Sequence, residues 1–110
     1  MKVNGRLTVA KFKKMFKDEF GVGVRVYNGV NFAKEDATLA SIRKGEPAKK
    51  SDDFEFHAFT KVGNAEKEFK DVFAVKIQIE NKEGELADDK ATLASLKIQG
   101  IKNIISKIFK

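Results

Sequence analysis

Apolar residues recur along this chain with two different periods. Residues 1–8 alternate apolar and polar positions, which is typical of a half-buried strand. From Val9 to Phe20, apolar residues recur every three or four positions and lysines occupy the opposite face. This period predicts an amphipathic helix of about three turns that begins after Thr8, a good N-cap residue, and ends at Gly21.

The same two periods continue through the first half of the chain. Over residues 22–26, valines alternate with glycine and arginine and predict a second strand. The dipeptide Asn28-Gly29 is a strong hairpin signal, so a short return strand is expected after it. A short helix is expected over residues 37–43, and the charged, proline-containing segment 45–53 is typical of an exposed linker.

The second half repeats this order of elements. Alternation over residues 54–59 predicts a third strand, helical spacing over 62–73 a second helix, and alternation over 75–79 a fourth strand. A second short helix is expected over residues 91–96. Isoleucines at helical spacing within residues 98–110 predict a C-terminal amphipathic helix that the first half lacks.

One pentapeptide occurs twice. The sequence Ala-Thr-Leu-Ala-Ser occupies residues 37–41 and again residues 91–95. Upstream, Phe16 matches Phe69 within a longer run of matching apolar positions, at an almost constant offset. Such a match seldom arises by chance in so short a chain. The pattern therefore indicates a tandem duplication of a unit of roughly fifty residues.

The element order strand, helix, strand, linker, strand, helix, strand is that of a ferredoxin-like α+β sandwich. We therefore predict an α+β fold, with one domain over residues 1–110 built from a tandem duplicated βαβ(β)α unit. Repeat one spans 1–45, repeat two spans 53–97, and the C-terminal helix spans 98–110. Two alternatives remain open: three-stranded units around a pseudo-twofold axis, and a domain-swapped dimer in which identical units exchange between chains.

The composition of the chain excludes several kinds of chemistry and indicates what kind of partner the protein binds. The chain has no cysteine, which excludes disulfides, thiolate catalysis and cysteine-ligated metal. Its apolar runs are short and its first residues are polar, so we expect no membrane span, no secretory signal and a cytoplasmic location. The formal net charge is +6, with both ends of the chain basic, which favours acidic partners.

Catalysis is poorly supported by the sequence. The single histidine, His57, stands near Glu55 on the predicted third strand, but no nucleophile lies beside this pair. The acidic segment 81–89 lacks the ligand spacing of an EF-hand. We therefore expect a protein that is not an enzyme and that needs no cofactor or metal.

A ferredoxin-like sheet would present cations beside aromatic rings on the face opposite its helices. Such faces stack bases in RNA-recognition domains. The acids Asp52, Asp53 and Glu55 at the start of the predicted third strand would repel phosphate, and the C-terminal helix can cover this face. The candidate binding residues are Arg6, Arg25, Tyr27, His57, Phe59 and Lys76.

The leading functional hypothesis is a small non-catalytic interaction module that binds a protein partner or a second copy of itself. Ten phenylalanines in 110 residues can exceed what one small core holds, which leaves an apolar patch for a partner. The alternative is a nucleic-acid-binding domain that uses the basic and aromatic sheet face. Phe59 separates the two hypotheses, and we expect it to be covered rather than open for base stacking.

Overall fold

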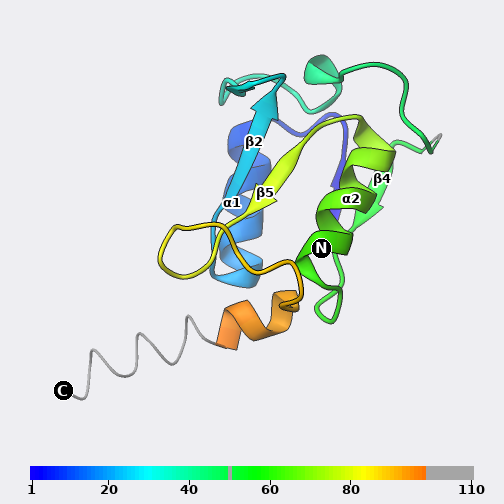
Figure 1. The fold of residues 1–110 in the computed structure, drawn as a ribbon. Coiled ribbons are helices and arrows are strands. Elements are labelled where there is room, and N and C mark those ends of the chain that lie inside the picture. The colour runs from blue at the N-terminus through cyan, green and yellow to red at the C-terminus, as the bar shows by residue number, and fades with distance from the viewer. Residues whose placement is uncertain (50, 99–110) are drawn as a thin grey trace.

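The computed structural model describes residues 1–49 and 51–98 (Figure 1). Helices and antiparallel strands build a small α+β fold, which confirms the predicted class. A third helical segment covers residues 93–98. The other elements are β1 (Lys2–Asn4), α1 (Val9–Phe20), β2 (Val24–Asn28), β3 (Asn31–Phe32), the 3-10 helix η1 (Ala40–Ile42), β4 (Asp53–Glu55), α2 (Val62–Phe73) and β5 (Ile77–Ile79).

The first helix begins and ends where local chemistry places its caps. The Thr8 side chain accepts a hydrogen bond from the Lys11 N–H at 3.2 Å, and Gly21 adopts a left-handed conformation with φ of 73°. The predicted bounds of α1 are therefore confirmed. The second helix has the same length, and Ala74 takes the left-handed position after it with φ of 54°.

The strands divide between two sheets. β1 pairs with β4, and the second sheet has the order β3-β2-β5, with every pairing antiparallel. Figure 1 shows β2 and β5 side by side, and α1 packs against β2 while α2 packs against β5 and β4. A ferredoxin-like sandwich places its strands in one sheet, so this part of the prediction is not confirmed.

A single aromatic core joins the two halves. The Phe12 ring of α1 stacks on the Phe69 ring of α2 with centroids 5.2 Å apart, and Phe56 packs edge-on against Phe16 at 5.3 Å. All nine residues that periodicity assigns to the core are buried, which confirms the predicted helix and strand phases. They are Val9, Phe12, Phe16, Phe20, Val24, Phe56, Phe69, Phe73 and Ile77.

The hydrogen bonds of the two halves correspond in detail. The first residue of each long helix donates its N–H to the first residue of the Ala-Thr-Leu-Ala-Ser sequence at 2.8 Å in both halves. Within that sequence, the serine hydroxyl donates to the threonine carbonyl at 2.7 Å in both. The matching pairs are Val9–Ala37 and Val62–Ala91, then Ser41–Thr38 and Ser95–Thr92.

Several predicted bounds are wrong. β4 ends at Glu55, although the Phe56 N–H still donates to the Met1 carbonyl at 2.8 Å. The chain then turns, because Ala58 offers its carbonyl to the N–H of Ala94 at 2.7 Å. His57 and Phe59 therefore do not lie on a sheet face. The first short helix is only the three-residue η1. The predicted C-terminal helix lies outside the described residues except for Ile98.

Candidate functional site

The outer face of the β2–β5 pair carries the polar side chains that the structure brings together. Val24 and Val26 point into the core, so alternation places Arg25 and Tyr27 on the opposite face, where both are half-buried. Arg25 pairs with Gln78 at the centre of the ladder. Lys76 precedes β5 and lies beside Tyr27.

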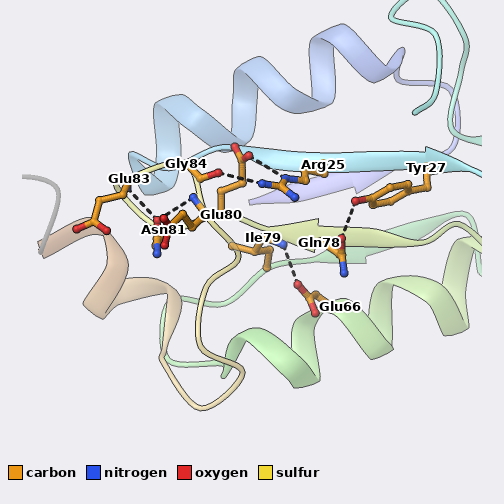
Figure 2. A network of polar contacts seen from close by, with 10 residues as sticks. Arg25, Tyr27, Glu66, Gln78, Ile79, Glu80, Asn81, Glu83 and Gly84 are labelled. Atoms are coloured by element: carbon orange, nitrogen blue, oxygen red, sulfur yellow. Dashed lines mark hydrogen bonds and ion pairs between the residues drawn. The ribbon is translucent and has the colours of Figure 1, made fainter. Parts of the chain in front are cut away.

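Arg25 is held by groups of the same chain (Figure 2). Its Nε donates to Glu80 Oε2 at 3.0 Å, and its Nη2 donates to the Gly84 carbonyl at 3.0 Å. The hydrogen bond to Glu80 raises the pKa of Arg25 above its ordinary value. A Cβ atom at Gly23 would collide with the Glu80 carboxylate, so glycine at this position leaves room for the pair. The charge of Arg25 is thus largely neutralised within the fold.

Tyr27 is enclosed by its cross-strand neighbours. Its hydroxyl donates to Gln78 Oε1 at 2.6 Å (Figure 2). Its ring stacks with Phe32 of β3, with centroids 5.2 Å apart, and the Lys76 ammonium lies 5.2 Å from the Tyr27 centroid. Because β3 and β5 flank β2 on opposite sides, the Tyr27 ring has a neighbour on each side.

The β2–β3 hairpin exposes apolar side chains. Val30 is 94% exposed and Phe32 is 68% exposed, and the turn between the strands uses Gly29 with φ of 66°. Val30, Phe32 and the adjoining ring of Tyr27 form what we call the hairpin patch. It lies at the end of the β2–β5 pair opposite to the loop that follows β5 (Figure 1).

A groove of about 580 Å³ lies beside the hairpin patch, between α1 and β2. Val24 and Val26 of β2 line it together with the exposed ring of Phe32, and Lys13 and Glu35 line its polar side. The Lys13 ammonium pairs with Glu35 Oε1 at 2.9 Å, and both side chains remain substantially exposed. This groove is therefore open to solvent and bordered by an ion pair.

The matching place beside β5 is occupied by a carboxylate. Glu66 of α2 accepts a hydrogen bond from the Ile79 N–H at 2.7 Å (Figure 2). Burial is the main cause that raises the pKa of Glu66, and nearby Asp89 adds to it. The Ile79 hydrogen bond and the Lys76 charge act in the opposite direction, and burial prevails.

The predicted site residues separate into different parts of the fold. Arg25, Tyr27 and Lys76 lie together on the β2–β5 face. Arg6 lies in the turn after β1, where it lines a cavity of about 350 Å³ with Arg43 and Asp52 among others. His57 and Phe59 lie in the loop after β4.

Phe59 is 85% exposed, so the expectation that it is covered is wrong. Its exposure is not evidence of an open sheet face either, because Phe59 lies in a turn outside the strands. Sequence reasoning placed Val30 and Phe32 on a short return strand and did not identify them as surface residues. β3 has only two residues and lies at the edge of its sheet, which only the structure shows.

No protein-family model matches the chain, and neither a curated protein nor a solved structure matches it. Within residues 1–49 and 51–98, no group of three or more histidine, aspartate or glutamate side chains is placed to hold a metal ion. Among these same residues, no helix combines the length and apolarity that crossing a membrane requires.

Proposed function

We propose that the chain is a small non-catalytic interaction module that binds a protein through the hairpin patch. The observation that carries this proposal is the exposure of Val30 and Phe32, two residues apart on one β-hairpin. Large apolar side chains gathered on one surface are typical of protein interfaces, where aromatic residues contribute most of the binding energy. Tyr27 extends the patch and is already held in place by Gln78.

The environment of Tyr27 and Arg25 favours a protein partner over nucleic acid. A base stacks on an open aromatic face, whereas the Tyr27 ring has Phe32 on one side and Lys76 on the other. A phosphate needs an available cation, whereas Arg25 is bound by the Glu80 carboxylate. The net charge of +6 supports the nucleic-acid alternative, which the experiments below include.

We also propose that the chain is one domain made by tandem duplication, with repeat one at 1–45 and repeat two at 53–97. The matching hydrogen bonds support this proposal, and so does the register of β2 and β5. The ladder is centred on Arg25 and Gln78, and the offset that relates α1 to α2 also relates these two residues. Such a centre is what a pseudo-twofold axis between the repeats produces.

The test of the interface compares two serine variants. Val30→Ser with Phe32→Ser removes the hairpin patch, and Leu86→Ser makes the same kind of change at the exposed position that matches Phe32 in the second half. Light scattering across a concentration series measures self-association, and quantitative cross-linking in the source cells measures binding to other proteins. We expect the double variant alone to lose the complex that the unmodified chain forms.

Two results would overturn this assignment. One is a chain that stays monomeric and forms no cross-linked complex. The other is a complex that the double variant retains in full. A titration with single-stranded RNA and DNA oligonucleotides at several salt concentrations tests the alternative. Tight binding that weakens steeply with salt and disappears in Lys76→Ala would make nucleic acid the better assignment.

A further inference from the structure

One backbone donor of β2 points into the groove beside the hairpin patch. The Val26 carbonyl accepts from the Ala33 N–H at 2.9 Å, on the side of β2 away from β5. In an antiparallel ladder the N–H and C=O of a residue point to the same side, so the Val26 N–H also points there. Within residues 1–49 and 51–98, the hydrogen bonds of this edge include none from the Val26 N–H.

The matching residue of β5, Ile79, has both of its outward backbone groups paired. Ile79 accepts from the Ala87 N–H at 2.9 Å, as Val26 accepts from Ala33. The Ile79 N–H then donates to the Glu66 carboxylate at 2.7 Å. In the second half, the chain itself therefore supplies the acceptor for this backbone donor, and the acceptor is a carboxylate.

The difference between the two edges traces to one helix position. Glu66 is the fifth residue of α2, and Lys13 is the fifth residue of α1, which has the same length. A lysine ammonium cannot accept a hydrogen bond, and that of Lys13 pairs instead with Glu35 at 2.9 Å. The first half therefore combines a backbone donor, a cation and a groove of about 580 Å³ where the second half holds a carboxylate.

We infer that this groove binds an aspartate or glutamate side chain of a partner protein. One carboxylate oxygen accepts from the Val26 N–H, and the Lys13 ammonium, which has further donors beside the one that Glu35 accepts from, supplies the positive charge. Hydrogen bonds to an ionised carboxylate are stronger than neutral ones. The other acids of the groove, Glu35 and Glu80, are each paired with a cation of the fold. This inference rests on the proposed function in one respect, namely that the carboxylate belongs to a protein.

The experiment uses a small probe, glutamate blocked as N-acetylglutamate methylamide, with the blocked glutamine as its uncharged match. Both are titrated into the ¹⁵N-labelled chain, and amide resonances are followed by NMR. We expect the Val26 amide proton to move downfield with the glutamate probe only, at a dissociation constant on the order of millimolar. This probe needs no partner protein, so its result is independent of the hairpin-patch variants.

Substitutions at the fifth helix position sharpen the test. Lys13→Glu reproduces the residue of the second half, so its own carboxylate should reach the Val26 N–H. Probe binding should then weaken by at least about tenfold, and hydrogen exchange at Val26 should slow. Lys13→Met, which keeps the aliphatic stem without the charge, should weaken binding several-fold if Lys13→Glu fails to fold. Lys14→Glu makes the same charge change on the exposed face and should leave binding unchanged.

Three results would overturn the inference: a Val26 amide that does not respond, equal responses to glutamate and glutamine probes, or equal losses in Lys13→Glu and Lys14→Glu. A response at Val26 with no loss of complex in the hairpin-patch variant would support the carboxylate site while rejecting the proposed interface. The reverse result would reject the carboxylate site and leave the interface in place.

Discussion

The two halves of the chain share an interior and differ at their edges. α1 and α2 have equal length, bury phenylalanines at matching positions and end in a left-handed residue. β2 continues into an apolar hairpin with Val30 and Phe32 exposed, whereas β5 continues into an acidic loop over residues 80–89. The interior is thus common to both halves, and the surfaces that can meet a partner are not.

This difference makes each half a control for the other. One position, Lys13 in α1 and Glu66 in α2, separates an edge that is open to a groove from an edge closed by a carboxylate. Both positions are half-buried, so each side chain can reach a partner at the adjoining strand edge or in solvent. The predictions below compare matched positions.

The largest effect is expected in the shared interior. Phe16→Ala and Phe69→Ala should each lower the free energy of unfolding by about 3–5 kcal/mol, because both rings are fully buried. Urea unfolding measures both losses, and Phe59→Ala is the control, since this exposed ring should change stability by less than about 0.5 kcal/mol. A loss below about 1 kcal/mol at one core site alone would show that the halves do not share the core equally.

The next effect separates the two edges. Glu66→Ala removes the acceptor of the Ile79 N–H and should cost about 1–3 kcal/mol in urea unfolding. Lys13→Ala breaks only a solvent-exposed ion pair and should cost less than about 1 kcal/mol. Equal costs at the two positions would contradict the distinction between a closed and an open edge.

The helix ends offer a smaller comparison. Gly21→Ala places a Cβ on a left-handed residue and should destabilise by about 1 kcal/mol. Ala74→Gly relieves the same strain but removes a buried methyl group. The free energy of unfolding, measured by thermal denaturation, should therefore rise by less than about 1 kcal/mol. Destabilisation by both substitutions would indicate that the left-handed conformation is not the controlling factor.

The smallest effect is a pH dependence. Because the pKa of Glu66 is raised by burial, the folded protein holds this proton more tightly than the unfolded chain. Its contribution is most favourable below the ordinary glutamate pKa, declines as pH rises through the raised pKa, and is constant above it. Glu66→Gln keeps an acceptor for the Ile79 N–H but has no proton to titrate, so the stability difference between the two proteins should show this decline. A difference that does not vary with pH would show that Glu66 titrates normally.

Local signals in the sequence were sufficient for the two long helices, α1 and α2, and for the core. Thr8 and Gly21 mark the ends of α1 because each acts on the backbone within one turn of itself. The phase of the buried phenylalanines follows from the helical period, and burial confirms it at Phe12 and Phe69. Neither inference requires knowledge of distant residues.

The candidate site was predicted only in part. Arg25 and Tyr27 share a strand face because alternation places them there, and Lys76 joins them through strand pairing. Arg6, His57 and Phe59 were assigned to the same face on the assumption of one sheet. The strands instead form two sheets, and the chain turns after Phe56, so these residues lie elsewhere.

Helix bounds, core positions and the repeated pentapeptide depend on the order of residues along the chain, which is why they can be read without a structure. Strand pairing depends on which edges meet, and many pairings satisfy one hydrophobic pattern. Tertiary contacts alone paired β2 with β5, brought Glu66 to Ile79 and left Val26 facing a groove beside Lys13. Lys13 and Glu66 occupy the same position in their helices, and only the structure shows that Glu66 reaches the Ile79 N–H whereas Lys13 pairs with Glu35.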